Sequence, residues 1–509
     1  MASSGAHGPT NILVIGLDGA NPALMQRLAE DGVMPFWRAL LQRTPLQPLE
    51  SVPPYATPAA WASIYTGATP AEHSVLDFID LAASDGRLVS GHSIRAAPIW
   101  KRLSDHGRRV AMIGFPLTYP PPTVTGVMVS GLPAPHRGAL WSYPAEFDAR
   151  LRAIPGFLPD PEMASPRVER EQSIVRLETH VQSVAQAALA AHEAYGRLGW
   201  DLFAVQFQAL DAFQHMFWAW VDPEDKRFLS YPPSERQRAR QFFRVLDDAL
   251  RRLVETLQPS DILILSDHGF GPAYEAICPN HLLLDQGLLR LSVTRSRWHA
   301  SLWMQSALKR LDVLNLRARL RFSARPGAAI DGLNRLTRDD LIDRQKSPAF
   351  VFSGGYCGLV NIKPGFESTV REALLQARHP TYNTPLFRSV TFPAELWDGP
   401  WLEAWGRCAI IQPQEGYLVD SHFRHYGLVA PVSAGLTGTH RPTGLLWTTL
   451  EALRPAQHVL HITPGILRAL GLPFSQSQFG TDGAESSSPP LSSEDQAAVE
   501  ERLRRLGYL

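Results

Sequence analysis

The sequence predicts an α/β fold in which helices cover both faces of a mostly parallel central sheet. Short, continuously apolar runs that are typical of buried strands alternate along the chain with longer amphipathic segments that are typical of helices. The chain has 509 residues, of which 45% are hydrophobic and only 19% are charged. This composition supplies enough apolar side chains for a large core and excludes a disordered chain.

Residues 11–17 (NILVIGL) form the first predicted strand, because apolar residues and one glycine follow each other there without a charge. Pro22 then favours the start of a helix, since proline suits the first helical position. Further along the chain the two kinds of element continue to alternate. The later predicted strands are residues 110–115, 202–210 and 261–266, and the predicted helices are residues 181–197, a segment that begins near Asp211, and residues 235–257.

The second half of the chain departs from this alternation. Residues 292–346 are rich in Arg and Leu and lack a strand pattern, which predicts a helical insertion that could act as a lid. Strand patterns return at residues 349–362 and 408–411. We therefore expect one catalytic α/β domain over residues 10–475, followed over residues 476–509 by a Ser/Gly/Pro-rich linker and a short C-terminal helix.

The composition also excludes several classes of partner and site. Lys+Arg and Asp+Glu both total 49, so the chain lacks the basic excess of a protein that binds nucleic acid in bulk. The three cysteines, Cys278, Cys357 and Cys408, are too far apart for a CxxC zinc site and do not suit a disulfide framework. The sequence shows no secretory leader and no run of ~18 apolar residues. We expect a cytoplasmic protein without a membrane span.

Three of the predicted strands lead into an aspartate, namely Asp18, Asp211 and Asp267. In open α/β sheets the ligand crevice lies beyond the carboxyl ends of the parallel strands. The three carboxylates are therefore expected at one edge of the sheet. The alternative for each aspartate is an ordinary helix N-cap, but the histidines that accompany two of them favour a shared site.

These histidines lie at spacings that suit metal binding. Asp211 and His215 are four residues apart, so a helix would place both side chains on one face. Asp267 and His268 directly follow a strand, from which both side chains could reach forward. His440, in the segment Thr-Gly-Thr-His-Arg-Pro-Thr-Gly, is the best candidate for a third nitrogen ligand. Each has an alternative reading. Asp211 and His215 could form a surface pair or a helix cap, Asp267 and His268 could mark an ordinary strand–turn boundary, and His440 could be a surface loop histidine.

Thr57 is the candidate nucleophile. Thr57 and Pro58 have the pattern of an N-cap followed by proline at the first helical position, with a helix that runs on to Tyr65. A helix N-terminus offers free N–H groups and a positive dipole end, where a phosphate can bind. A hydroxyl at that point is placed to attack phosphorus if a metal ion lowers its pKa. The alternative is that Thr57 only caps the helix.

Taken together, these segments resemble the alkaline phosphatase superfamily, specifically its type I phosphodiesterase/nucleotide pyrophosphatase family. No single motif is specific, but their order and spacing match over roughly residues 11–475. The matching motifs are Val-Ile-Gly-Leu-Asp18-Gly, Thr57-Pro-Ala-Ala-Trp61 followed by Tyr-Thr-Gly, His73-Ser-Val-Leu-Asp-Phe78, Asp211 to His215, Ser-Asp267-His268-Gly-Phe-Gly, Gly-Thr-His440, and residues 462–473. The last residues of the chain, 501–509, resemble the tail of a subgroup of predicted bacterial phosphohydrolases.

The resemblance implies an alkaline-phosphatase-like fold and a site for two divalent metal ions. The implied ligands form two groups: Asp211, His215 and His440 for one ion, and Asp18, Asp267, His268 and the oxygen of Thr57 for the other. Zinc is the expected metal because the ligands are nitrogen and carboxylate without thiolate, and manganese and iron are alternatives. The implied reaction is hydrolysis of a phosphoric ester, in which metal-bound Thr57 attacks phosphorus and the resulting phospho-threonine is then hydrolysed.

Two departures from related patterns bear on the substrate. Nucleotide pyrophosphatases carry an asparagine at the position of Phe78, so this motif does not predict a nucleotide substrate. The Cys- or Ser-x-Pro-x-Arg motif of sulfatases is absent around Thr57, which disfavours sulfate esters. Arg441, beside His440, is a candidate contact for phosphate, and the alternative is a salt bridge or exposure to solvent.

We therefore predict a metal-dependent hydrolase that acts on a small-molecule phosphate ester, with diesters favoured over monoesters. The alternatives are a phosphomonoesterase or phosphoryl transferase of the same fold, and a catalytically silent binding protein. The aromatic residues near the metal motifs are expected in the core, with an apolar wall for the leaving group as the alternative: Phe213, Phe217, Trp218, Trp220 and Trp61. The remaining histidines considered are expected to be structural or exposed: His73, His281, His422 and His425.

Overall fold

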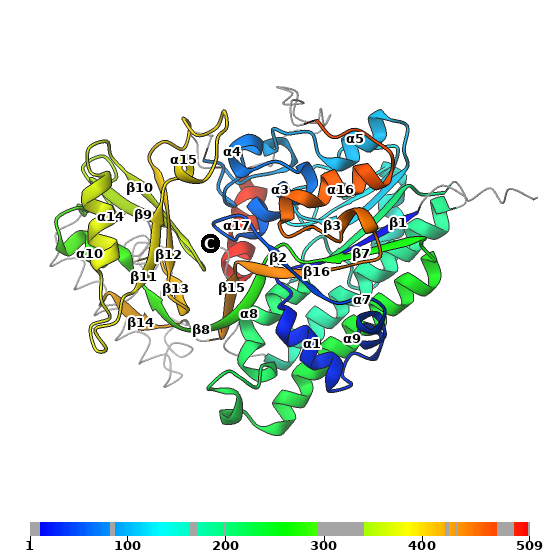
Figure 1. The fold of residues 1–509 in the computed structure, drawn as a ribbon, viewed down its shortest axis with the longest axis horizontal. Helices are drawn as coiled ribbons and strands as arrows, with labels where there is room; N and C mark the ends of the chain where they lie inside the picture. The colour runs from blue at the N-terminus through cyan, green and yellow to red at the C-terminus, as the bar shows by residue number, and fades with distance from the viewer. Residues whose placement is uncertain are drawn as a thin grey trace, which may run out of the picture. The chain divides into compact units, whose positions relative to one another are not determined.

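The computed structural model describes residues 11–81, 87–162, 170–196, 199–292, 341–422, 427–432, 435–475 and 493–506. These residues form two compact units (Figure 1). The first unit includes the described residues of Met1–Ala273, Trp397–Trp405 and Ser433–Leu509. The second unit includes those of Tyr274–Leu396 and Gly406–Val432.

An eight-stranded sheet forms the centre of the first unit, in the order β2-β16-β7-β1-β6-β3-β4-β5. Its strands are β1 (Ile12–Leu17), β2 (Gln47–Glu50), β3 (Val110–Phe115), β4 (Gly126–Ser130), β5 (Ser142–Tyr143), β6 (Leu202–Phe207), β7 (Asp261–Leu265) and β16 (Thr443–Thr448). The strands from β7 to β4 are parallel, whereas β2, β16 and β5 pair antiparallel towards the two ends. The prediction of a mostly parallel sheet is confirmed.

The register of the central strands determines where the chain delivers its polar residues. All residues of β1, β3 and β6 are buried, as expected for strands that helices cover on both faces. Leu17 of β1 lies opposite Phe207 of β6, and Gly16 lies opposite Leu265 of β7. These three neighbouring strands therefore end at the same level, and the residues that follow them meet at one edge of the sheet.

Helices cover both faces of this sheet. The helices of the first unit are α1 (Pro22–Glu30), α2 (Pro35–Arg43), α3 (Thr57–Thr66), α4 (Pro70–His73), α5 (Ile99–Asp105), α6 (Asp148–Ala153), α7 (Arg170–Tyr195), α8 (Ala209–Val221), α9 (Pro233–Leu257), α16 (Ile462–Ala469) and α17 (Ser493–Leu506). In Figure 1, α7 and α9 lie on one side of the sheet and α3, α5 and α16 on the other. None of the helices in the described residues combines the length and the apolarity that a membrane span requires.

Two of these helices differ from their predicted bounds. Helix α7 begins at Arg170 rather than near residue 181, because Ser173, Ile174 and Leu177 continue its buried face through a more polar first part. The predicted strand at residues 202–210 ends earlier, at Phe207, and α8 begins at Ala209. The short C-terminal helix is present as α17, which buries Val499 and Leu503.

The aromatic residues near the metal motifs lie in the core, as predicted. Phe213, Phe217, Trp218, Trp220 and Trp61 are all at most 4% exposed. Phe213 of α8 stacks on a phenyl ring of α9 with a centroid distance of 4.2 Å. These contacts fix α8, which carries two candidate ligands, against the rest of the unit.

The second unit has its own sheet and its own hydrophobic core. Its antiparallel sheet has the order β11-β12-β10-β9, from β9 (Ala349–Ser353), β10 (Gly358–Ile362), β11 (Phe387–Thr391) and β12 (Cys408–Pro413). Its helices are α10 (Pro279–Asp285), α14 (Glu367–Gln376) and α15 (Pro393–Leu396). Most of the predicted insertion, residues 293–340, and the predicted linker, residues 476–492, lie outside the described residues.

A further small sheet is built on β8 (Gly269–Ile277), which pairs with β13 (Gly416–Val419), β14 (Val429–Pro431) and β15 (Gly438–Arg441). The part that matters for the site lies within the first unit. There, β15 runs antiparallel to the start of β8, with His440 opposite Phe270 and Arg441 opposite Gly269. This pairing brings the chain around residue 440 back to the edge of the sheet that follows β7.

Candidate metal centre

Three buried aspartates lie together at the carboxyl edge of the central sheet, as the sequence predicts. Asp18 directly follows β1, and Asp267 follows β7 after one intervening residue. Asp211 is not at a strand end, however, because it is the third residue of α8. All three side chains are completely buried. Burial of three carboxylates in one place requires a source of compensating positive charge.

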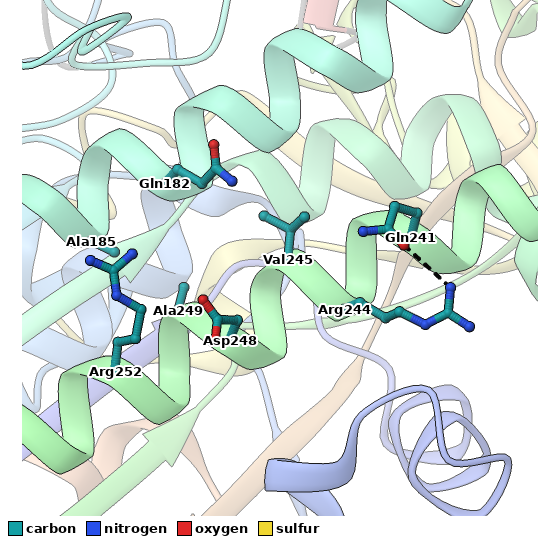
Figure 2. A pocket seen from close by; sticks show the side chains of 8 residues that line it. All are labelled: Gln182, Ala185, Gln241, Arg244, Val245, Asp248, Ala249 and Arg252. Carbon is teal, nitrogen blue, oxygen red and sulfur yellow. Dashed lines mark hydrogen bonds between the residues drawn. The ribbon is translucent and has the colours of Figure 1, made fainter.

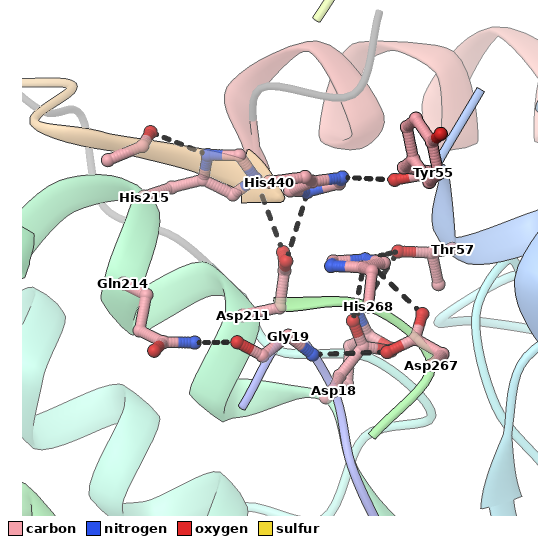
Figure 3. Close-up of polar contacts among 12 residues, drawn as sticks. Asp18, Gly19, Tyr55, Thr57, Asp211, Gln214, His215, Asp267, His268 and His440 are labelled. Atoms are coloured by element: carbon pink, nitrogen blue, oxygen red, sulfur yellow. Dashed lines mark hydrogen bonds and ion pairs between the residues drawn. The ribbon is translucent and has the colours of Figure 1, made fainter. Parts of the chain in front are cut away.

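The first group of candidate ligands consists of Asp211, His215 and His440 (Figure 3). Asp211 and His215 lie on one face of α8, with 3.4 Å between Asp211 Oδ2 and His215 Nε2. His440 arrives from β15, and its Nε2 lies 3.1 Å from Asp211 Oδ1 and 3.0 Å from His215 Nε2. The structure thus brings together the three residues that the family resemblance assigns to one ion.

The second group surrounds Thr57. The Thr57 hydroxyl oxygen lies 3.4 Å from Asp18 Oδ1 and 3.4 Å from His268 Nε2. His268 Nε2 also lies 3.2 Å from Asp267 Oδ2. Asp18, His268 and Asp211 can place one ligand atom each within 4.8 Å of one another. The two groups adjoin, since the rings of His268 and His440 stack with a centroid distance of 3.8 Å.

Thr57 occupies a different helical position from the one predicted. It is the first residue of α3, and the N-cap is Ala56, which has no side-chain oxygen to cap the helix. Pro58 is therefore the second helical residue. The Thr57 hydroxyl faces Asp18 and His268, so the prediction that this residue serves as the N-cap is wrong.

All three histidines direct the same ring nitrogen into the site. Nδ1 of each lies next to a backbone carbonyl oxygen: His215 at 3.2 Å from Gly438 O, His268 at 3.1 Å from Gly269 O, and His440 at 2.9 Å from Tyr55 O. A carbonyl oxygen can only accept a hydrogen bond, so Nδ1 carries the proton in each neutral ring. The lone pairs of Nε2 then point into the site, which is the arrangement found in metal-binding histidines.

The protonation of the carboxylates reflects their crowding. Burial raises the pKa of Asp18 well above its ordinary value, and the charges of Asp267 and Asp211 raise it further. Burial likewise raises the pKa of Asp267, although the Gly19 N–H, 3.1 Å from Oδ1, opposes this. Burial also acts to raise the pKa of Asp211, but His215 and the other imidazoles outweigh it and hold this pKa below its ordinary value.

Burial also affects two of the imidazoles, those of His215 and His268. Burial lowers the pKa of His215 to about 4, and it lowers the pKa of His268 well below its ordinary value. Protonation of these two rings is therefore disfavoured as a source of the positive charge that the buried carboxylates need. Neutral imidazoles and carboxylates are the donors that zinc, manganese and iron bind, so the residues present fit a divalent metal.

Several residues that support the site were not predicted. Trp61 Nε1 and Gln206 Nε2 each donate a hydrogen bond of 2.8 Å to Asp18 Oδ2. Tyr55 supplies the carbonyl that orients His440, from a backbone with φ of 61° that is uncommon for a residue with a side chain. The one sequence feature that could have revealed Gln206 is its position as the polar residue of the buried strand LFAVQF.

The remaining sequence candidates have other surroundings. Arg441 donates to the carbonyl oxygens of His440 and Pro272, at 2.7 and 2.6 Å, so its contact with phosphate stays a prediction. Phe78 is buried in the core. His73 is buried and lies 2.9 Å from the Ser63 hydroxyl oxygen, which fits a structural role. Of the other three histidines, His281 and His422 belong to the second unit, and His425 is outside the described residues.

A separate pocket of about 230 Å³ lies between α7 and α9 (Figure 2). Its lining is mostly polar and contains none of the candidate ligands: Gln182, Ala185, Gln241, Arg244, Val245, Asp248, Ala249 and Arg252. It offers a few charged groups but no cluster of acid, base and nucleophile.

Comparisons with known proteins identify the family and the fold of the chain. A family model described as Type I phosphodiesterase / nucleotide pyrophosphatase matches residues 12–342. A search of the curated proteins found no match. The structure of phosphonoacetate hydrolase from Sinorhizobium meliloti 1021 in complex with phosphonoacetate is similar, with a TM-score of 0.56 and 16% identity over 91% of this chain and 95% of that chain. The complex of that hydrolase with phosphonoformate has a TM-score of 0.51, with the same identity and coverage. This likeness confirms the predicted alkaline-phosphatase-like fold.

Proposed function

The chain belongs to the type I phosphodiesterase / nucleotide pyrophosphatase family, and from this membership we propose that it hydrolyses a phosphoric diester with Thr57 as nucleophile and two divalent metal ions. The family match confirms the prediction that the chain is a phosphoric ester hydrolase. The residues of the site support the nucleophile and the ions, the preference for a diester rests on the family alone, and experiment must test all three.

One observation carries the proposal. His215 Nε2 and His440 Nε2 lie 3.0 Å apart, while Nδ1 of each ring donates to a backbone carbonyl. With the Nδ1 proton facing a carbonyl oxygen in each ring, the two Nε2 atoms direct their lone pairs at each other. Such a pair, beside a buried Asp211 carboxylate, is stable when a cation lies among the three ligands. The proposed ligands of this ion are therefore Asp211, His215 and His440.

The second ion is proposed to bind Asp18, Asp267, His268 and the oxygen of Thr57. Asp267 Oδ2 is buried and accepts no hydrogen bond from the residues that the structure describes. Such burial costs a carboxylate oxygen free energy unless a cation or a proton occupies its lone pairs. Two divalent ions would outweigh the charge of the three aspartates. The pocket would then attract an anionic ester although the chain as a whole is neutral.

Thr57 is proposed to attack phosphorus in line with the departing ester oxygen. Its hydroxyl loses its proton, the new Oγ1–P bond forms as the P–O bond to the leaving alcohol breaks, and the alcohol departs with a proton. Water then cleaves the phospho-threonine and restores the hydroxyl. The metal ions, when bound, would lower the pKa of the hydroxyl and stabilise the charge on the departing oxygen.

The protein itself contributes orientation and exclusion of water. Thr57 is completely buried at the start of α3, where the first turn of the helix presents backbone N–H groups to an incoming phosphoryl oxygen. Asp18 Oδ1 and His268 Nε2 hold the hydroxyl from two sides at 3.4 Å. A fixed nucleophile reacts faster because its orientation is established before the substrate binds.

The test compares a diester, bis-p-nitrophenyl phosphate, with a monoester, p-nitrophenyl phosphate, in the presence of Zn²⁺ or Mn²⁺. Thr57→Ala removes the nucleophile, and Thr57→Ser is the matched control because it restores a hydroxyl. We expect the diester to be the better substrate, Thr57→Ala to lower kcat by at least ~10³-fold, and Thr57→Ser to keep part of the activity.

Each other outcome contradicts a defined part of the proposal. A preference for the monoester would indicate a phosphomonoesterase. Transfer of the phosphoryl group to an added alcohol instead of water would indicate a phosphoryl transferase. Purified protein that binds neither zinc nor manganese would contradict the two-ion site, and equal activity of Thr57→Ala and wild type would contradict the nucleophile. Metal binding without any turnover of these substrates would favour a silent binding protein.

A further inference from the structure

We infer that Trp61 and Gln206 are positioning residues that hold Asp18 in a one-oxygen binding mode and thereby set the affinity of the metal site beside Thr57. This inference rests on the proposed two-ion centre. It concerns two side chains that touch neither the Thr57 hydroxyl nor the group formed by Asp211, His215 and His440. Their only described polar contact with the centre is to one oxygen of Asp18.

The two oxygens of Asp18 have different surroundings. Oδ2 accepts hydrogen bonds of 2.8 Å from both Trp61 Nε1 and Gln206 Nε2. Oδ1 faces the site, at 3.4 Å from the Thr57 hydroxyl oxygen and 3.7 Å from His268 Nε2. Two neutral donors therefore occupy the lone pairs of Oδ2 and leave Oδ1 as the oxygen available to a cation. Asp18 is presented as a ligand with a single, fixed oxygen.

The orientation of the Gln206 amide is determined by its acceptors. Nε2 donates both to Asp18 Oδ2 and, at 2.9 Å, to Gln208 Oε1. Rotation of the amide would turn the Gln206 oxygen toward two other acceptor oxygens, which is unfavourable. The side chain is 1% exposed, so these hydrogen bonds form away from water, where they are stronger and where their loss is costly.

Trp61 links the ligand to the nucleophile through α3. Trp61 and Thr57 are four residues apart on this helix, so they lie on one face, one turn from each other. The indole ring is completely buried and packs edge to face against Phe115 at a centroid distance of 5.3 Å. The hydrogen bond from Trp61 to Asp18 therefore fixes the position of α3 relative to the end of β1, which sets the distance between Thr57 and Asp18.

A glycine in the central strand provides an independent observation. Gly16 lies in β1, in register with Gln206 of β6. A Cβ atom at Gly16 would lie 2.5 Å from Trp61 Cη2 and 3.1 Å from Gln206 Cγ. Glycine weakens a strand interior, so its presence here needs a packing reason. The absence of a side chain at this position allows both donors to reach Asp18 across β1.

The experiment measures metal affinity rather than catalysis. Metal-free wild type, Trp61→Phe and Gln206→Met are titrated with Zn²⁺ and Co²⁺ in competition with a chromophoric chelator, which gives the affinity and stoichiometry of each ion. Each variant removes one N–H donor and keeps a side chain of similar volume. Trp447→Phe is the matched control, because Trp447 of β16 is as completely buried as Trp61 and, within the described residues, donates to the carbonyls of Leu40 and Thr44 rather than to a candidate ligand.

We expect Trp61→Phe and Gln206→Met each to weaken one of the two ions by about 10- to 100-fold and to leave the other unchanged, as is usual for partners of a metal ligand. Gly16→Ala should produce the same selective loss, because it displaces both donors without removing either. Trp447→Phe should change neither affinity. A general loss of stability would affect both ions or neither, so the selective loss distinguishes positioning from folding.

The failure of this inference is distinguishable from that of the proposed function. If wild type binds two ions and both donor variants bind them with wild-type affinity, the positioning role is refuted and the two-ion centre stands. If wild type binds no metal, the proposed centre itself is refuted. Weakening of both ions to the same extent in Trp61→Phe, Gln206→Met and Trp447→Phe would also refute the positioning role.

Discussion

The close approach of β15 to α8 gives the most specific prediction for the metal centre. Gly438 begins β15, two residues before His440. A Cβ atom at this position would lie 2.5 Å from the backbone oxygen of Gln214 and 2.8 Å from both Trp218 Cβ and a ring carbon of Phe270. Gly438 does not have a positive φ, so Gly438→Ala tests the space at this point rather than the backbone conformation.

The size of the effect follows from these distances. Ordinary contact begins at 3.4 Å, so the strand must retreat from α8 by about 0.9 Å, the difference between 3.4 and 2.5 Å. Overpacking of this kind costs about 1–3 kcal/mol in free energy of unfolding. The same displacement separates His440 from His215 and Asp211, whereas metal ligands tolerate only about 0.2 Å. We expect the affinity of the site formed by Asp211, His215 and His440 for its ion to fall by about 10- to 100-fold.

The assay combines metal titration with urea unfolding for wild type, Gly438→Ala and a control, Gly427→Ala. Gly427 is a suitable control because the nearest atom to a Cβ there, Val429 O, is 3.9 Å away. We expect the control to match wild type in both measurements. In Gly438→Ala, the ion bound by Asp211, His215 and His440 should be weakened while the ion at Asp18 is retained. The reasoning would be refuted if Gly438→Ala were less stable yet bound both ions with wild-type affinity.

Two further predictions concern stability. Burial lowers the pKa of His73 to about 3, so the folded state disfavours protonation; the stabilisation is complete above the ordinary pKa of 6.5 and is lost as the pH falls toward 3. By this linkage, His73 should lower the free energy of unfolding of the wild type by about 2 kcal/mol when the pH falls from 7 to 5. In urea unfolding, His73→Gln should lose about 2 kcal/mol less than wild type over the same pH range. Arg227 donates to buried Asp225 and to the carbonyls of Ala273 and Thr437. Arg227→Met should therefore lower the free energy of unfolding by about 3 kcal/mol, because it leaves the Asp225 carboxylate buried without its cation. The double variant Arg227→Met/Asp225→Asn should recover part of this loss in the same assay. An absence of recovery would contradict the role of the unpaired carboxylate.

The predicted elements that were correct are those with a strong local pattern. Strand β3 has its predicted bounds, and β1 and β7 differ from theirs by one residue. The prediction succeeds because a short, uninterrupted apolar run is typical of a strand that is buried on both faces of a sheet. The end of β6 was predicted too late. Ala209 and Leu210 continue the apolar pattern, but they are the first residues of α8, with Gln208 as its N-cap. Periodicity alone does not distinguish a buried strand from the buried first turn of a helix.

The position of Thr57 shows a second limit of local reasoning. Thr followed by Pro is a frequent start of a helix, and the sequence predicted the helix correctly. The structure begins α3 one residue earlier than predicted, so the hydroxyl does not cap the helix. Its direction depends on Asp18 and His268, which come from β1 and from the end of β7. Such a contact is invisible in the neighbouring sequence.

The sequence by itself determined which candidate ligands lie close together along the chain. Asp211 and His215 are brought together by helix geometry, and Asp267 and His268 by adjacency, because both relations depend only on the next few residues. Only the tertiary structure decided how these pairs combine. His440 meets His215 across 225 positions of the chain, three carbonyl oxygens select the Nε2 face of the imidazoles, and Trp61 and Gln206 select one oxygen of Asp18. These choices depend on the register of β1, β6 and β15, which is fixed by packing of the whole unit and not by any local segment.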